Sequence, residues 1–333
     1  MEKLKSLSFI KKKKDMSFLD EMKFVIASNL ELIICQKCNL ACEHCMRGEG
    51  SNKVISDKVL DATFQKFNYI DNLALGGGDP SLVPETINKI ADAIIKNKTI
   101  VKHVNLTTNG AQISDEFIQS LLKLKKVIES KESKNSIFHS DLDEIPVIVC
   151  FSFDDFHLKQ LIEKGYSIND IFNNVAKVQK ALNEKIEIRI ECDIDIINSG
   201  RAKDYSGNIP KHKAMSPNDH IYPYYIHNHN VLFGGIFTIS CDGEVVPPNI
   251  PFKDEIILSF GNIVNQSLSK ITANMNTKKL NKPEQVSYEY NKLLSRMSSS
   301  KLRANKYLKS VGYKKLNIIY SNIEHSLKEL GEN

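Results

Sequence analysis

The sequence predicts an α/β protein built on a parallel β-sheet. Short apolar runs rich in β-branched residues alternate at least five times with segments whose apolar residues have helical spacing. Unusual residues, such as the three glycines at 76–78, come directly after these runs. This alternation favours a parallel sheet with helical crossovers, rolled up or doubly wound, whose functional residues gather where the strands end.

The elements are expected in this order. A helix over 17–29 precedes the first strand. The expected strands are 30–34, 72–80, 102–110, 145–155 and 185–197. The expected helices are 56–70, 83–97, 114–128 and 167–182, three of which begin at a serine that is a good N-cap. A polar surface insertion is expected at 130–144.

The pattern changes beyond about residue 203. Residues 214–230 form an irregular stretch, and 231–248 are expected to form a hairpin that turns at Asp242 and Gly243. The last fifty residues are rich in lysine and serine and are expected to be mostly helical. We therefore predict an N-terminal basic arm and helix at 1–29, a core at 30–202, and a C-terminal region at 203–333.

Composition excludes several classes of protein. The 333 residues carry a formal net charge of +5, and only five of the basic residues are arginine. Because arginine is favoured for reading phosphates and bases, the chain is not expected to bind nucleic acid. No apolar run is long enough to cross a bilayer, and the basic N-terminus lacks a secretory signal pattern. We expect a cytoplasmic protein with no membrane partner.

Four cysteines lie within eleven residues, in the order Cys35-x2-Cys38-x3-Cys42-x2-Cys45. A four-thiolate zinc site normally separates its two pairs by a long spacer, and a ferredoxin run has different gaps. The inner triplet, in a loop after the first strand, resembles the signature of the radical S-adenosylmethionine (radical SAM) superfamily. That resemblance implies a partial (β/α)6 TIM-like barrel, of which the sequence shows five clear strands, with a C-terminal hairpin and helical extension.

The resemblance also implies the cofactors. Cys38, Cys42 and Cys45 are expected to bind three irons of one [4Fe–4S] cluster, and the fourth iron is left for the amino and carboxylate groups of SAM. Cys35 is expected to be structural. His44 stands where the family often has an aromatic residue whose backbone meets adenine.

Three further stretches match the family in position. GGGDP resembles the motif that receives the SAM amino group, so Gly76, Gly77, Gly78 and Asp79 are expected to bind SAM. Thr108 and Asn109, in TTNG, contact SAM or substrate or simply form a turn before a helix.

In SFDD, Ser152 and Asp154 share one side of a strand and bind the ribose hydroxyls or the methionine carboxylate, unless the acid caps a helix. Arg201, in SGRA, binds a carboxylate or phosphate or forms a surface salt bridge.

The C-terminal hairpin resembles a SPASM or twitch domain, but Pro247, Pro248 and Asn249 stand where a cluster cysteine is expected. We therefore predict one cluster only. His220, His227 and His229 bind a metal, line a substrate entrance or pack on the surface.

The predicted function is reductive SAM cleavage to a 5′-deoxyadenosyl radical that abstracts hydrogen from a peptide. The alternatives are an epimerase or dehydrogenase of a sugar or other small molecule, and a non-catalytic iron–sulfur or zinc-binding regulator. A reductant such as flavodoxin or ferredoxin is the expected protein partner.

Overall fold

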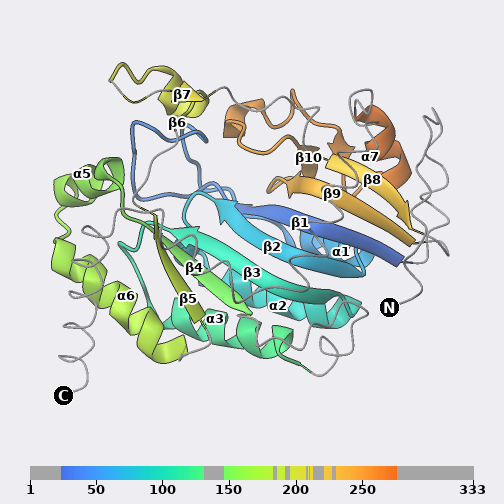
Figure 1. Ribbon diagram of the computed structural model, residues 1–333, viewed down its shortest axis with the longest axis horizontal. Helices are drawn as coiled ribbons and strands as arrows, with labels where there is room; N and C mark the ends of the chain where they lie inside the picture. The colour runs from blue at the N-terminus through green and yellow to red at the C-terminus, as the bar shows by residue number, and fades with distance from the viewer. Residues whose placement is uncertain are drawn as a thin grey trace.

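A parallel sheet forms the centre of the protein. The computed structural model describes residues 24–130, 146–182, 186–191, 196–207, 209, 211–212, 221–226 and 230–275. The sheet has the strand order β11-β10-β9-β1-β2-β3-β4-β5, with β8 paired to β9 (Figure 1). Its two ends do not pair with each other. The predicted α/β class is confirmed, and the open sheet is consistent with a partial TIM-like barrel.

The strands differ in direction. The sheet comprises β1 (Phe24–Cys35), β2 (Tyr69–Gly77), β3 (Ile100–Thr108), β4 (Val147–Ser152), β5 (Ile186–Glu191), β8 (Ile221–Ile226), β9 (Asn230–Ile239), β10 (Glu244–Val246) and β11 (Gly261–Asn262). From β9 through β1 to β5, neighbouring strands are all parallel. Strands β8, β10 and β11 add antiparallel pairs. The parallel strands therefore bring their carboxyl ends to one edge of the sheet.

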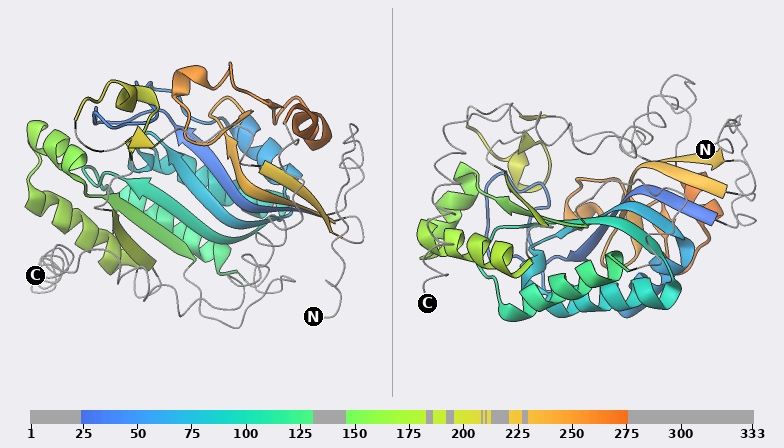
Figure 2. Two further views of the ribbon diagram at one scale, coloured as in Figure 1. Left: turned by 45° about the horizontal axis from the view of Figure 1, so that its top comes forward. Right: turned by 60° about the horizontal axis from the view of Figure 1, so that its bottom comes forward.

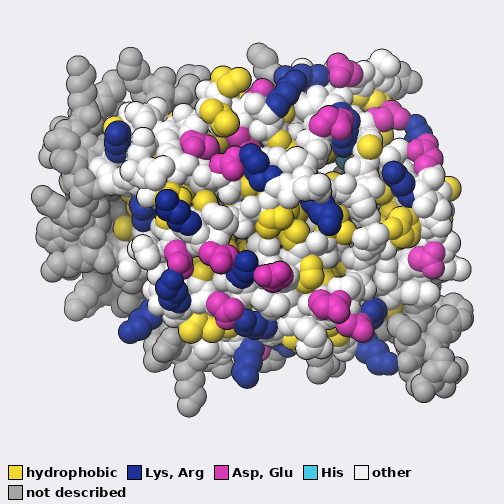
Figure 3. Space-filling view, turned by 180° about the vertical axis from the view of Figure 1, so that it is seen from behind, with side chains coloured by type: hydrophobic (Ala, Val, Ile, Leu, Met, Phe, Trp, Pro, Cys, Tyr) yellow, Lys and Arg dark blue, Asp and Glu magenta, His cyan; other side chains and the backbone are white. Residues whose placement is uncertain are grey.

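Helices cover one face of this sheet (Figures 1 and 2). They are α1 (Asp57–Lys66), α2 (Pro84–Asn97), α3 (Asp115–Ile128), α5 (Asp155–Glu163) and α6 (Ile168–Leu182). The predicted caps Ser56 and Ser114 accept hydrogen bonds from the backbone N–H groups at the starts of α1 and α3. Lys89 of α2 pairs with Asp57 of α1, and Figure 3 shows lysine and acidic side chains interspersed over the back of the molecule.

The alternation of residues along the strands separates the two faces. Leu30, Leu73 and Val104 are fully buried in the core between the sheet and the helices. Their neighbours Asn29 and Asn72 point to the opposite face and are only partly buried. Many of the side chains on this opposite face are polar. At the carboxyl ends of the strands, this face lines the candidate site.

The C-terminal segment continues the same sheet. The predicted hairpin is present as β9 and β10, and Gly243 adopts a positive φ of 85° in its turn. A 3-10 turn at Phe252–Asp254, strand β11 and helix α7 (Leu268–Asn274) follow. None of the helices in the described part of the chain has the length and apolar composition that a bilayer crossing needs.

Three expectations about the fold were wrong. The helix predicted over 17–29 is strand from Phe24 onward, because this segment pairs with both β2 and β9. The stretch 214–230, predicted to be irregular, contains β8. The long strand predicted over 185–197 is divided into β5 and β6 (Ile196–Ile197), and β6 pairs with β7 (Lys211–His212) in a separate sheet.

The hairpin strand also supplies the sixth parallel strand, since β9 lies beside β1 rather than beside β5. Several predictions fall outside the described residues: the insertion from 131 to 144, the last fifty residues, Cys192, His220, and the pair His227 and His229.

Candidate functional site

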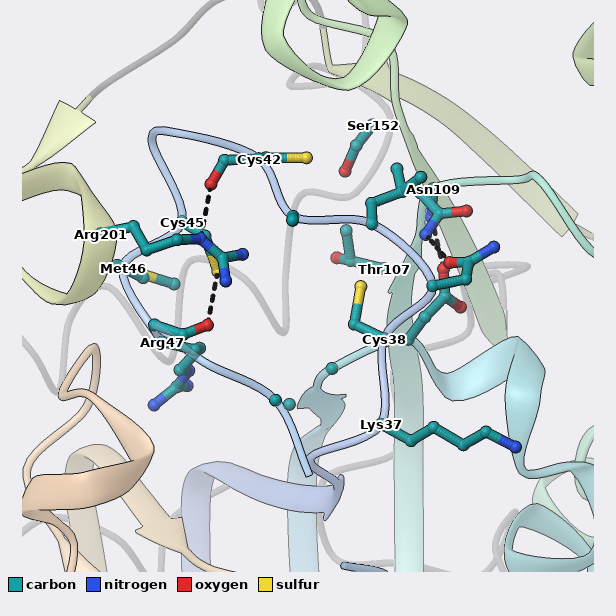
Figure 4. Close-up of a pocket in the computed structure, with 18 of the residues that line it drawn as sticks. Lys37, Cys38, Cys42, Cys45, Met46, Arg47, Thr107, Asn109, Ser152 and Arg201 are labelled. Atoms are coloured by element: carbon teal, nitrogen blue, oxygen red, sulfur yellow. Dashed lines mark hydrogen bonds between the residues drawn. The ribbon is translucent and has the colours of Figure 1, made fainter. Parts of the chain in front are cut away.

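A cavity of about 940 Å³ lies at the carboxyl ends of β1 to β4. Every residue that the sequence predicts to bind a cofactor or metal lines this one cavity: Cys38, Cys42, His44, Cys45, Gly76, Gly77, Gly78, Asp79, Thr108, Asn109, Ser152, Asp154 and Arg201. Their contribution to cofactor binding stays a prediction, but the fold brings all of them together. Figure 4 shows the labelled side chains around this space.

The loop that carries the cysteines leaves β1 at Cys35. Its two ends are held together by bonds from Gln36 N to the carbonyl of Lys53 and from Ser51 N to the carbonyl of Gln36. Cys38 is exposed, Cys42 is buried and Cys45 is half-buried. The three side chains project from the same loop into the cavity (Figure 4).

Cys35 behaves differently from the triplet. Its side chain has no exposed surface, and its Sγ lies 3.5 Å from the carbonyl oxygen of Asp79 and 3.6 Å from that of Lys37. Burial raises the pKa of its thiol to about 12. These contacts support the predicted structural role of Cys35.

Burial also keeps two of the predicted ligands protonated before a metal binds. Cys38 is exposed as a whole residue, but its thiol lies in the cavity, where partial desolvation raises its pKa to about 11; burial raises the pKa of Cys42 to about 12. Thiolate is the form that binds metal, so loading of this site releases protons.

The donor set fits an iron–sulfur cluster better than a single ion. A tetrahedral ion with metal–sulfur bonds of about 2.3 Å needs its thiolates ~3.8 Å apart. Among the described residues, the group whose ligand atoms converge within 4.8 Å is Cys42, His44 and His157, not the cysteine triplet. A cluster that offers a separate iron to each thiolate suits the wider triplet.

Two buried polar atoms beside the cysteines suit a polar ligand. The amide Nδ2 of Asn39 and the ring Nδ1 of His44 are buried and have no hydrogen-bond partner. Both residues line the cavity. Because a buried polar atom without a partner is costly, these two atoms indicate that a polar group occupies the space beside the cysteine loop.

The three glycines bring β2 against the start of the cysteine loop. A Cβ at Gly77 would lie 2.1 Å from the carbonyl oxygen of Cys35, and one at Gly78 would lie 2.1 Å from that of Lys37. Gly76 has more room, since the nearest atom would be 3.3 Å away. Close approach of two backbones thus requires glycine at 77 and 78.

Asp79 joins two of the predicted motifs. Its side chain is 1% exposed and accepts bonds from Thr108 Oγ1 at 2.8 Å and from Asn109 N at 2.9 Å. It also accepts from the backbone N–H and the hydroxyl of Ser81. Both carboxylate oxygens are therefore engaged within the protein, and the acid braces the turn at Thr108 and Asn109 rather than facing the cavity alone.

Asp154 is a helix cap, which is one of the two roles predicted for it. Its Oδ1 accepts the N–H groups of Phe156 and His157 at 3.0 Å, and its Oδ2 lies 2.5 Å from His157 Nδ1. Burial opposes its ionisation, but the bond and charge of His157 outweigh this and lower its pKa. Both oxygens are engaged by the start of the helix, and the binding of SAM by Asp154 or Ser152 stays a prediction.

His44 packs against this cap. Its ring stacks on Phe156 at a centroid distance of 4.6 Å, and its Nε2 lies 3.7 Å from Asp154 Oδ2. Burial lowers the pKa of His44, although Asp154 acts in the opposite direction. A neutral imidazole therefore forms this wall of the cavity.

Arg201 is bound to the cysteine loop itself. Its Nε donates to the carbonyl of Cys42 at 3.0 Å, its backbone N–H donates to that of Cys45 at 2.9 Å, and its Nη1 pairs with Glu49 at 3.1 Å. The predicted salt bridge is therefore present, and the bonds to the loop were not anticipated.

Sequence reasoning missed several lining residues. Thr107 is part of the TTNG motif, and Asn39 lies between Cys38 and Cys42. His157 is the third residue after the N-cap Asp154, a position from which a side chain reaches the cap. Arg47 and Phe252 gave no signal, because folding alone brings the segment after β10 to the cysteine loop, where Phe252 N donates to the carbonyl of Arg47.

A protein-family model matches the part of the chain that carries the cysteines. Residues 32–190 match the model of the radical SAM superfamily. Members of that superfamily are enzymes that bind a [4Fe–4S] cluster and SAM.

Two curated relatives match parts of the chain. The chain is 29% identical over 194 residues to the uncharacterized protein MJ0795 of Methanocaldococcus jannaschii. This alignment covers 50% of this chain and 36% of MJ0795. Over 95 residues the chain is 28% identical to human molybdenum cofactor biosynthesis protein 1, covering 26% and 14% respectively. The chain thus spans well under half of either relative's length.

Solved structures with a related arrangement have low identity. The structure of native anSMEcpe with bound AdoMet and Cp18Cys peptide aligns with a TM-score of 0.47 at 16% identity, covering 76% of this chain and 83% of that one. Streptococcus suis SuiB bound to precursor peptide SuiA aligns with a TM-score of 0.39 at 11% identity, covering 78% and 66%.

Proposed function

We propose that the protein is a radical SAM enzyme that cleaves SAM reductively and abstracts a hydrogen atom from a substrate held in the same cavity. The observation that carries this proposal is the convergence of three thiols, the glycine turn and the TTNG turn on one cavity at the carboxyl edge of a parallel sheet. When bound, the cluster and SAM supply an electron and a 5′-deoxyadenosyl radical.

The chain's own residues bind and orient these groups. Cys38, Cys42 and Cys45 would hold the cluster. The hydroxyl of Ser152, the amide Nδ2 of Asn39 and the ring Nδ1 of His44 are among the polar atoms available to a bound SAM, whereas Asp79 and Asp154 already bind other groups of the protein. Asp79 keeps the TTNG turn in place, so its contribution to SAM binding is indirect.

The polar face of the sheet supports an uncharged polar substrate. Asn105 Nδ2 donates to Asn72 Oδ1 at 3.1 Å, and Asn72 Nδ2 donates to Asn29 Oδ1 at 3.2 Å. This ladder of amides crosses three strands. Glu31, an acid on the same face, pairs with Arg47 and also accepts a hydrogen bond from the hydroxyl of Thr238.

These amides do not line the cavity themselves, but they make the face that leads to it polar and uncharged, which suits a substrate that carries amides of its own. We therefore propose a peptide as substrate, ahead of a sugar or another small molecule. The C-terminal region from 203 onward would help to bind it.

The proposed partners follow from the surface. The interspersed charges of Figure 3 and the scarcity of arginine disfavour nucleic acid. We propose a cytoplasmic enzyme that takes its electron from flavodoxin or ferredoxin and has no membrane partner.

The test is anaerobic reconstitution with iron and sulfide, reduction with dithionite, addition of SAM, and assay of 5′-deoxyadenosine by liquid chromatography. Wild type should produce deoxyadenosine and Cys42→Ala should not. Equal yields from the two proteins would refute the proposal.

A metal-binding regulator is the second candidate, because Cys42, His44 and His157 are close enough for one ion. That site would leave Cys38 and Cys45 without a role. Iron and acid-labile sulfide analysis separates the two candidates: a cluster gives about four of each per chain, whereas a single ion gives no sulfide.

A further inference from the structure

The turn Ser199–Arg201, which opens the 3-10 helix Gly200–Lys203, lies against the outer side of the cysteine loop. Ser199 Oγ donates to the carbonyl of Met46 at 3.1 Å. Arg201 donates from its side chain to the carbonyl of Cys42 (Figure 4) and from its backbone N–H to the carbonyl of Cys45. Three carbonyl groups of the loop are thus bound by a segment about 150 residues further along the chain.

Gly200 makes this contact sterically tight. It has a φ of 56°, in the left-handed region that favours glycine. A Cβ at this position would lie 2.4 Å from the carbonyl oxygen of Met46 and 2.5 Å from that of Cys45. Both atoms are backbone, so an alanine here must displace the loop.

The part of the cysteine loop from Cys42 to Gly48 has few backbone hydrogen bonds within itself, so bonds from other segments matter for its conformation. Between Cys42 and Gly48 its internal backbone bonds are those from Cys45 N to the carbonyl of Cys42 at 3.1 Å and from Gly48 N to the carbonyl of Cys45 at 3.3 Å. This segment is neither helix nor strand. Contacts from outside therefore help to fix its conformation: the Ser199–Arg201 turn binds three of its carbonyls, and Phe252 N binds that of Arg47.

Arg201 also brings a positive charge to the thiols. Its side chain is 22% exposed, and its ion-pair partner Glu49 is 85% exposed, so water weakens that pair. Because Arg201 Nε is bonded to the carbonyl of Cys42, this charge lies beside the cysteine loop. A cluster held by thiolates is anionic, and reduction adds one more negative charge.

We propose that the Ser199–Arg201 turn is a positioning element of the cluster site: it holds the cysteine loop in its metal-binding conformation, and the Arg201 charge raises the reduction potential of the cluster. This role rests on the proposed cluster and differs from the predicted binding of a substrate or SAM carboxylate by Arg201. Substitutions can separate the two parts of this role, which are the contacts that hold the loop and the positive charge of Arg201.

Four variants of the reconstituted full chain separate them. Gly200→Ala disturbs the packing of the turn against the loop and keeps the charge of Arg201. Arg201→Gln removes the charge, and Arg201→Lys keeps it while reducing the hydrogen bonds to the loop. Glu49→Gln is the matched control, because it removes the exposed ion pair without touching the loop carbonyls.

Two measurements are made without SAM: the rate of iron release to a chelator, and the midpoint potential from an EPR-monitored redox titration. We expect ~10-fold faster iron release from Gly200→Ala and Arg201→Lys, as for other groups that orient metal ligands. The potential should fall in Arg201→Gln and stay at the wild-type value in Arg201→Lys. Glu49→Gln should match wild type in iron release.

Wild-type iron release and wild-type potential in Arg201→Gln would overturn the proposal, as would a fall in potential of equal size in Arg201→Lys. If Arg201→Gln does not fold, unchanged iron release in both Gly200→Ala and Arg201→Lys overturns it. Failure of the proposed function is distinguishable from failure of this positioning role. In that case the wild-type protein itself would form no cluster or produce no deoxyadenosine.

Discussion

Replacing Thr108 with valine tests whether the hydrogen bonds around Asp79 hold the site together. Thr108 is 2% exposed, and its Oγ1 lies 2.8 Å and 3.1 Å from the two oxygens of Asp79. The same hydroxyl accepts the backbone N–H of Gly110 at 3.1 Å. Valine has nearly the same shape, so the change removes these bonds and leaves the packing almost intact.

The expected cost follows from these contacts. A hydrogen bond to a charged group contributes about 1.5–3 kcal/mol, and a buried N–H left without an acceptor costs about 1–3 kcal/mol. Together they predict a loss of ~3 kcal/mol in the free energy of unfolding. At ~3 kcal/mol per molar urea, the unfolding midpoint should fall by about 1 M.

The neighbouring Thr107 provides the matched control. It is exposed and lines the cavity, and none of the described side-chain hydrogen bonds involves it. Thr107→Val should change stability by less than about 0.5 kcal/mol, as is usual for exposed positions. Both variants are compared by urea unfolding followed by circular dichroism under anaerobic conditions. If the two variants have the same midpoint, the bracing role of Asp79 and Thr108 is refuted.

Three further predictions concern other parts of the site. Burial raises the pKa of Glu255 from its ordinary 4.5 to about 7, so its contribution to stability is complete below pH 4.5 and is lost as the pH rises to about 7. Wild type should therefore lose about 3 kcal/mol relative to Glu255→Gln between pH 4.5 and 8, and parallel urea-unfolding curves across this range would contradict the assignment. Cys35→Ala should keep the iron and sulfide content of wild type, whereas Cys42→Ala should lose it; equal loss in both would make Cys35 a ligand. Asn72→Leu removes the acceptor of Asn105 Nδ2 and the donor to Asn29 Oδ1, while Asn29 Nδ2 keeps its bond to the carbonyl of Gly235, so the change should cost about 1 kcal/mol in thermal or urea unfolding; unchanged stability would show that the ladder is not formed.

Local rules in the sequence determined much of the fold. Serine caps and apolar spacing at 3.6 residues placed α1 and α3, and β-branched runs placed the central strands, because these signals act between near neighbours. The helix predicted over 17–29 failed for the opposite reason. Residues from Phe24 onward are strand because they pair with β2 and β9, and such pairing overrides local preference.

The sequence also determined which residues meet at the site. Cysteine spacing, glycines and strand-end polar residues are local marks of chemistry, and parallel strands bring their ends to one edge, so all of the predicted residues line one cavity. What each side chain does there was decided by tertiary structure. Asp79 binds Thr108 and Asn109, and Arg201 binds the carbonyls of the cysteine loop, because hydrogen-bond partners 29 to 159 residues apart meet only after folding.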